Sequence, residues 1–208
     1  MSCQSIGLIT AESAREAKEL MKPVPGQDAF GGTPGTEPLV RVGPLVSLAF
    51  LMRSLGAEPL PVFAGAGFSL EEFHDPDHKI PFRPASRLLA DCVEAASCEH
   101  LGLLLGQMAE PTHLGLPGFL VHTAPTVEHA LNSLVDNLDL HDDGTSVRYD
   151  SGADYSAMSM VIEVGRVAAL EVINDLGAVM ICKVMQLLCG PDRSPLSVKW
   201  QRREPDDR

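Results

Sequence analysis

The chain has 208 residues, of which 45% are hydrophobic, enough for one globular domain with a real core and an appendage. The formal net charge of −12 disfavours direct binding to nucleic acid, because an acidic surface repels phosphate groups. The sequence shows no secretory signal and no uninterrupted apolar run of about 18 residues that could span a membrane. Its cysteines form no CxxC pair, and such cysteine usage is typical of a reducing compartment. We therefore expect a cytoplasmic protein.

Residues 1–43 are predicted to form a flexible leader. Residues 23–38 hold four prolines and four glycines in sixteen positions, a composition typical of linkers. The compact domain is expected to extend from Pro44 to Gln201, followed by a short tail at residues 202–208.

Helical spacing of apolar residues dominates the first half of this domain. A proline at the first helical position suits the starts at Pro44 and Pro84, and a further short helix is predicted over His100–Met108. Thr126 can cap an amphipathic helix that extends to His141.

The hydrophobic period then changes from helical to alternating. Ser146–Asp150 and Ala157–Val164 are predicted as antiparallel strands, and Leu196, Val198 and Trp200 alternate in a last strand. Between them, Val167–Leu188 forms a long helix that is apolar almost all round, so it is either central or lies against a partner. The predicted fold class is α+β, in which N-terminal helices precede a small antiparallel sheet of three or more strands packed with the long C-terminal helix.

Familiar catalytic signatures are absent from the sequence. It contains no G-x-S-x-G, no H-E-x-x-H and no P-loop, and Gly65-Ala66-Gly67 is better explained as a turn than as a dinucleotide site. We therefore expect a protein that is not an enzyme and that carries no cofactor.

One short segment keeps a metal-based alternative open. His74, Asp75, Asp77 and His78 could bind a divalent metal, which would indicate a small metal-dependent enzyme or a metal sensor. The competing interpretation is an exposed acidic turn, because the sequence places no further protein ligand beside them.

Candidate ligand-binding residues lie near the predicted Thr126 helix and on or beside the strands. A histidine that borders a cavity can hydrogen-bond a small molecule, although solvent-facing histidines are commoner. An arginine can hold a carboxylate with two hydrogen bonds, although Arg166 could instead pair internally with Glu163 or Glu171. The candidates are His113, His122, His141, Arg148, Glu163 and Arg166.

A series of short motifs in a fixed order resembles one protein family. The motifs are Gly56-Ala57-Glu58-Pro59, Ala66-Gly67-Phe68, Asp75-Pro76-Asp77, Ile80-Pro81, Leu101-Gly102-Leu103, Gly115-Leu116-Pro117-Gly118-Phe119, Ala124-Pro125-Thr126, Gly190-Pro191-Asp192 and Pro195-Leu196. In this order and spacing, they resemble the N-terminal arabinose-binding-like domain of AraC-type bacterial transcription regulators.

The resemblance implies a domain that senses a small-molecule effector and often forms dimers. In the family, two helix-turn-helix units that bind DNA follow it, whereas only seven residues follow Gln201 here, so we expect the DNA-binding domain to be absent from this chain. The expected function is effector sensing and homodimerisation, with the effector between the sheet and the helix flanked by Thr126 and His141. A domain that only oligomerises is a further alternative.

Overall fold

The computed structural model describes residues 37–152, 156–165, 167–192, 195 and 197–198. These residues form a mixed helix-and-sheet fold with two separate two-stranded sheets. The α-helices of the described part are α2 (Leu48–Ser54), α3 (Pro59–Gly65), α4 (Phe82–Ala96), α5 (Leu101–Met108), α6 (Leu116–Thr123), α7 (Val127–Asn137) and α8 (Leu170–Cys189).

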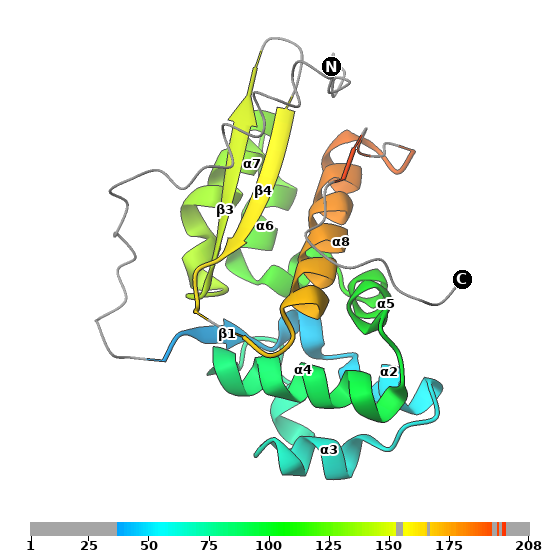
Figure 1. Ribbon diagram of the computed structural model, residues 1–208. Coiled ribbons are helices and arrows are strands. Elements are labelled where there is room, and N and C mark those ends of the chain that lie inside the picture. Colours follow the sequence, from blue (N-terminus) through cyan, green and yellow to red (C-terminus); the bar gives the residue numbers. More distant parts are fainter. Residues whose placement is uncertain (1–36, 153–155, 166, 193–194, 196, 199–208) are drawn as a thin grey trace.

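Helix α8 runs through the middle of the molecule (Figure 1). A strand hairpin with helices α6 and α7 lies along one side of it, and α5 packs along another side. Helix α4 crosses close to the beginning of α8, α3 packs on the side of α4 away from the hairpin, and α2 contacts α3 and α5.

Both sheets are antiparallel pairs. Strand β1 (Leu39–Arg41) pairs with β2 (Lys79–Pro81), and β3 (Thr145–Ser151) pairs with β4 (Ser156–Ile162). A single bridge between Val40 and Asp142 connects the first pair to the start of the second.

The mixed helix-and-sheet class and the long C-terminal helix are confirmed, but a sheet of three or more strands is not. The predicted last strand rests on Leu196 and Trp200, which lie outside the described residues, and Val198 belongs to no strand. The strands that are described divide into two pairs, because only one isolated bridge joins β1 to the segment that precedes β3.

Two hydrophobic cores share helix α8. Val172 and Leu176 near its beginning belong to the core formed with α2 to α5, whereas Met180 and Val184 belong to the core under α6, α7 and β3. A helix between two cores needs apolar residues on more than one face, which explains its nearly continuous hydrophobic sequence. Among the described residues, α8 is also long and apolar enough to cross a membrane, a criterion that a core helix equally meets.

Several elements differ from the sequence-based prediction. Strand β1 lies within residues 1–43, which the composition assigned to a leader; the rest of that leader falls almost wholly outside the described residues. The helix expected at Pro44 is a 3₁₀ turn, η1 (Gly43–Leu45), followed by α2. The helix capped by Thr126 ends at Asn137 and is followed by another 3₁₀ turn, η4 (Leu138–Leu140).

Helices α3 and α6 lie in segments for which no helix was predicted. Helix α6 begins with Leu116, Pro117 and Gly118 and is apolar on nearly every side, so it carries no helical periodicity. It packs so closely on the preceding turn that a Cβ at Gly118 would collide with the Pro111 carbonyl. Glycine is therefore required there by close packing.

Two glycines let α5 lie directly on α8. A Cβ at Gly102 would collide with the Val172 carbonyl, and one at Gly106 would lie 2.7 Å from Val179 Cβ. Because the glycines are four residues apart, they form a flat strip on one face of α5. The backbone of α8 fits against this strip.

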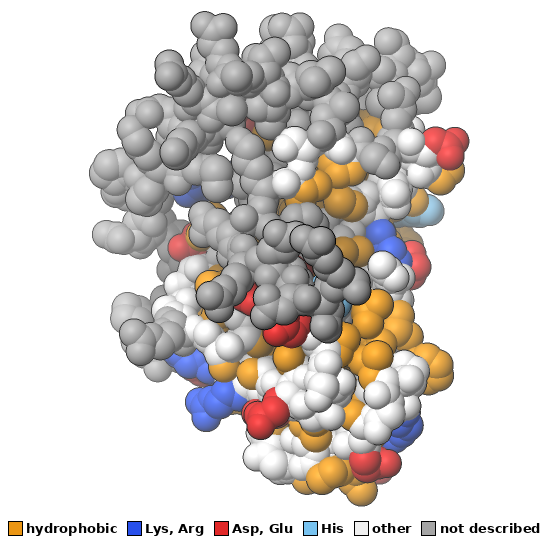
Figure 2. Space-filling view, turned by 45° about the vertical axis from the view of Figure 1, so that its right-hand side comes forward, with side chains coloured by type: hydrophobic (Ala, Val, Ile, Leu, Met, Phe, Trp, Pro, Cys, Tyr) orange, Lys and Arg blue, Asp and Glu red, His pale blue; other side chains and the backbone are white. Residues whose placement is uncertain are grey.

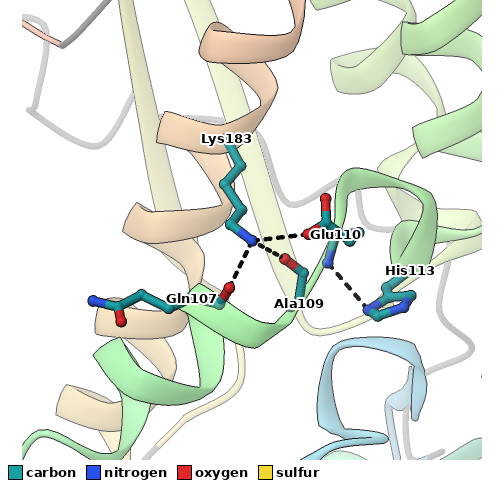
Figure 3. A network of polar contacts seen from close by, with 5 residues as sticks. All are labelled: Gln107, Ala109, Glu110, His113 and Lys183. Carbon is teal, nitrogen blue, oxygen red and sulfur yellow. Dashed lines mark hydrogen bonds and ion pairs between the residues drawn. The ribbon is translucent and has the colours of Figure 1, made fainter. Parts of the chain in front are cut away.

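Lys183 of α8 binds the carboxyl end of α5 (Figure 3). Its Nζ donates hydrogen bonds to the carbonyl of Gln107, at 2.8 Å, and to the carbonyl of Ala109. It also lies 3.2 Å from Glu110 Oε1. A cation at this point satisfies carbonyls that a helix end leaves without partners and favours the negative end of the helix dipole.

Candidate ligand-binding site

A cavity of about 120 Å³ lies where the two cores meet. Its walls come from β1, α4, α7, the η4–β3 segment, β4 and α8, so it sits between the β3–β4 hairpin and the central helix. Most of the wall is hydrocarbon, and its main apolar residues are Val40, Leu45, Phe82, Ala85, Leu89, Leu114, Leu134, Leu138, Val147, Met160, Ile173, Leu176, Met180, Ile181 and Val184.

Five polar residues interrupt this apolar wall. They are Arg41, Ser86, His141, Asp142 and Thr145. All except Arg41 are among the buried polar residues, and the Arg41 side chain is only 15% exposed. Four of the five come from β1 and the turn into β3, which the Val40–Asp142 bridge joins, so the polar groups gather at one end of the cavity.

Ser86 fixes the chain that leads into α8. Its hydroxyl oxygen accepts hydrogen bonds from the backbone N–H of Ala168, at 2.8 Å, and of Ala169, at 3.3 Å. These two amides are at the N-terminal side of α8, where the helix itself supplies no acceptor. The acceptor capacity of Ser86 is therefore already in use.

Asp142 closes the turn between η4 and β3. Its Oδ1 accepts the N–H of Gly144 at 2.6 Å. Burial raises the pKa of the Asp142 carboxyl above its ordinary value, and the Gly144 hydrogen bond partly offsets that rise. Gly144 is required because a Cβ there would lie 2.7 Å from the Phe82 ring.

Arg41 is held in place from several sides. Its guanidinium pairs with the Asp77 carboxylate, and its backbone N–H donates to the His141 carbonyl at 3.0 Å. The guanidinium also lies on Gly115, where a Cβ would come within 2.6 Å of Arg41 Cζ. Gly115 has a φ of 72°, which L side chains rarely adopt, so both its backbone and its contact favour glycine.

His141 is the buried polar residue of the cavity with an unused ring atom. Its side chain is 7% exposed, and Nδ1 has no hydrogen-bond partner among the residues described. Burial lowers its pKa to about 3, and the charges of Arg41 and Lys79 act in the same direction. The imidazole is therefore neutral near pH 7 and can donate or accept one hydrogen bond at each nitrogen, according to its tautomer.

The structure places the predicted histidines in three different environments. His141 lines the cavity, whereas His113 and His122 do not. His113 Nδ1 accepts the backbone N–H of Glu110 at 3.2 Å, which forms a capping arrangement at the turn η3 (Pro111–Leu114). His122 is exposed on α6.

Two of the three predicted charged residues, Arg148 and Glu163, lie outside the wall of the cavity. Arg148 stands opposite Ser159 in the hairpin, on the opposite face of β3 from Val147, which does line the cavity. Glu163 is exposed and accepts a 2.7 Å hydrogen bond from the Ser146 hydroxyl. Arg166 is not among the described residues.

The four residues proposed as a metal cluster do not meet around a common point. Asp77 pairs with Arg41, Asp75 accepts the N–H of Asp77 at 2.9 Å, and His78 faces Glu72 at 3.8 Å. His74 is exposed. Within the described ranges, no group of three His, Cys, Asp or Glu residues is arranged to hold a metal ion.

Sequence reasoning did not single out Arg41, Ser86, Asp142 or Thr145. These residues are up to a hundred positions apart in the sequence, and no spacing rule connects them. One weak signal for Thr145 was present in the segment that forms β3. Thr145 and Val147 alternate with Ser146 and Arg148, and such alternation indicates that one face of the strand is buried.

One comparison with known proteins relates the chain to a family. Residues 56–208 match the arabinose-binding domain of AraC transcription regulators, the N-terminal domain of those proteins. No match was found among the curated proteins. The matched segment covers far more than half of the sequence and includes α3 to α8, hence most of the cavity wall. The chain therefore belongs to the family of the arabinose-binding N-terminal domain of AraC transcription regulators.

Proposed function

We propose that this chain binds a small-molecule effector in the cavity between the β3–β4 hairpin and α8, and passes on its presence as a sensor without catalysing a reaction. The observation that carries the proposal is a cavity at the junction of two cores, with the unpaired Nδ1 of buried His141 in its wall. An apolar cavity with a few polar groups is the usual form of a small-molecule site. Family membership supports a regulatory ligand-binding role.

The position of the cavity suggests how occupancy would be transmitted. Its walls include both the hairpin and α8, while α5 is fixed to α8 through Gly102, Gly106 and Lys183. An effector that fits one arrangement of hairpin and helix better than another shifts the population toward that arrangement. The rigidly joined α5 and α8 would then move as one unit.

Binding at this site can be tested with a cavity-filling variant. Ala85 is 3% exposed and lines the cavity, so Ala85→Leu places a larger apolar side chain inside it. A thermal-shift screen of amino acids, fatty acids, sugars and small aromatic compounds is run on both proteins. An effector of this site raises the melting temperature of the wild type and not that of Ala85→Leu. Equal shifts in both proteins would place binding elsewhere.

We also propose that two copies of the chain associate through the exposed face of α8. Leu170 at its beginning and Leu187 near its end are 44% and 42% exposed, and many apolar residues between them are half-buried. Hydrophobic side chains reach the surface between scattered charged groups on the side of the molecule shown in Figure 2. Apolar surface of this kind is typical of protein interfaces.

Light scattering tests the dimer. We expect a mass near twice 22.3 kDa for the wild type. Leu187→Lys should reduce it to that of a monomer, and Leu60→Lys, at an exposed position on α3, serves as the matched control. A monomeric wild type at high protein concentration would refute the dimer.

The chain alone is expected not to bind promoter DNA, because its net charge of −12 opposes contact with phosphates. An electrophoretic mobility shift specific for one DNA sequence at physiological salt would contradict this expectation.

A further inference from the structure

We infer that the molecule bound in the cavity is small, uncharged and mainly hydrocarbon, with a single polar group, and that sugars and amino acids are excluded. This inference rests on the proposed function, because it names the class of effector for the same site. It follows from the size of the cavity, from the pairing of its polar groups and from the charges around its polar end.

The size of the cavity restricts the effector to a few heavy atoms. The volume is about 120 Å³. An apolar protein cavity of about 150 Å³ holds one benzene molecule. A single ring with a short substituent, or an aliphatic chain of similar volume, therefore fits with small adjustments of the flexible Met160 and Met180 side chains in the wall.

The polar groups of the wall are mostly committed to the protein. Ser86 accepts two backbone amides, Asp142 accepts the N–H of Gly144, and Arg41 pairs with Asp77. A pentose brings several hydroxyl groups, each of which loses its hydrogen bonds to water when it is buried. The free polar atoms of the described wall are Arg41 Nε, His141 Nδ1 and Thr145 Oγ1, all at one end of the cavity, so they cannot replace the hydrogen bonds of hydroxyl groups all round a sugar ring.

The charges around the polar end exclude an anionic effector. The two cations beside His141 each have an acidic partner, since Arg41 pairs with Asp77 and Lys79 lies 3.8 Å from Asp143. Asp142 adds a further buried carboxyl group. A carboxylate placed here would meet no unpaired cation among the described residues, and burial without a partner is costly for a charge.

A cationic effector is disfavoured at the same place. Asp142 is the only acidic residue in the described wall, and its carboxyl group already accepts the N–H of Gly144. Burial also raises its pKa, so it is a weak partner for a cation, and burial of a charge without a partner is costly. Free amino acids carry both an ammonium and a carboxylate group, so both arguments apply to them.

His141 supplies one of the hydrogen bonds that remain at the polar end, where Arg41 Nε and Thr145 Oγ1 are also buried without a partner among the described residues. Its Nδ1 is buried and has no partner in the described part of the chain, and its neutral ring can serve either as donor or as acceptor. A hydroxyl group can take either role and so matches whichever tautomer is present. A small alcohol or phenol satisfies this requirement together with those of size and charge.

Four probes that share a benzene ring, together with one sugar, test the requirements of size, charge and hydrogen bonding separately. Binding of benzyl alcohol, toluene, benzoate, benzylamine and L-arabinose to the full chain is measured by calorimetry and by thermal shift. We expect benzyl alcohol to bind best, and toluene to bind about threefold to tenfold more weakly because it lacks one hydrogen bond. Benzoate, benzylamine and L-arabinose should show at least tenfold weaker binding than benzyl alcohol.

Two variants test whether the probes bind in the cavity and whether His141 causes the preference for benzyl alcohol. In His141→Leu, benzyl alcohol should lose its advantage over toluene, while continued toluene binding shows that the variant keeps the cavity. In Ala85→Leu, both probes should lose binding. Preference for L-arabinose or for a charged probe in the wild type, or no binding of either neutral aromatic probe, overturns the inferred class and leaves the cavity as a proposed site. Neutral probes that bind Ala85→Leu as well as the wild type instead overturn the proposed site itself.

Discussion

The Ser86 hydroxyl accepts the backbone N–H of Ala168 at 2.8 Å, across 82 positions of the sequence. The N–H of Ala169 approaches the same oxygen at 3.3 Å. One side chain of α4 thus holds the chain at the entrance to α8. Because Ser86 is also in the cavity wall, this contact connects the position of α8 to the site.

Replacing Ser86 with alanine removes the acceptor of two amides at the start of α8. Loss of a buried hydrogen-bond partner typically costs about 1–3 kcal/mol of unfolding free energy. Urea denaturation should therefore show this loss for Ser86→Ala. Ser159→Ala, at an exposed position of β4, is the matched control and should change stability by less than about 0.5 kcal/mol. Similar losses in both variants would argue against an anchoring role for Ser86.

Gly102→Ala should force α5 away from α8. The new Cβ would collide with the Val172 carbonyl, which belongs to a helix backbone and cannot move aside cheaply. Overpacking of this kind costs about 1–3 kcal/mol. Gly65→Ala provides the contrast, because nothing lies within 4 Å of a Cβ there, and alanine favours helix by about 0.5–1 kcal/mol. Thermal denaturation should show opposite signs for the two variants.

Lys183→Met keeps the length of the side chain and removes its charge. The carbonyls of Gln107 and Ala109 would lose a charged hydrogen-bond donor. This loss should lower the free energy of unfolding by about 1.5–3 kcal/mol. The ion pair with Glu110 should contribute much less, because Glu110 is 62% exposed and solvent screens the pair.

Glu110→Gln separates these two contributions. A glutamine oxygen can still accept the hydrogen bond that caps η3, so the stability should fall by less than about 0.5 kcal/mol. The contrary result is that Lys183→Met and Glu110→Gln lose equal amounts of unfolding free energy, with losses that depend strongly on salt. That result would show that the ion pair with Glu110 is the main contribution of Lys183 to stability.

Stability should fall as the pH decreases below neutrality because of His141. Its pKa is about 3 in the folded state and about 6.5 in an unfolded chain, so the unfolded state takes up the proton first. Between about pH 7 and pH 5, this difference should remove ~2 kcal/mol of unfolding free energy in the wild type. His141→Leu should lack this loss, and His129→Gln, at an exposed position of α7, should retain it.

Two other groups affect the choice of pH range. Burial also lowers the pKa of His113, which adds a loss of the same sign in both proteins. The raised pKa of Asp142 acts in the opposite direction, because its folded form binds a proton more readily, and this effect grows toward lower pH. Denaturation curves are therefore best compared above about pH 5. Parallel pH profiles for the wild type and His141→Leu would contradict the neutral, buried imidazole.

Elements with a clear hydrophobic period were predictable from the sequence. Helix α4, the α7 segment with its Thr126 cap and the β3–β4 hairpin all show apolar residues at the expected spacing. The Thr126 hydroxyl does accept the N–H of His129, at 3.1 Å, as the capping pattern implies.

Elements held by distant contacts were not predictable in the same way. Strand β1 has only three residues, and its partner β2 lies about 40 positions further on, so no local pattern identifies it. The cavity raises the same difficulty, since its polar end joins residues from β1, α4 and the start of β3. His141 was singled out only because histidines concentrate between positions 113 and 141, a clue that selected His113 and His122 as well.

The walls of the cavity come from positions as far apart as Val40 and Val184. A molecule bound there would contact β1, α4, α7, the β3–β4 hairpin and α8 at once. Its binding free energy would add to the stability of the whole domain, by RT ln(1 + [L]/Kd). Slower amide hydrogen exchange would then extend to β1 and to the carboxyl half of α8 together, so that these two distant segments would report occupancy equally well.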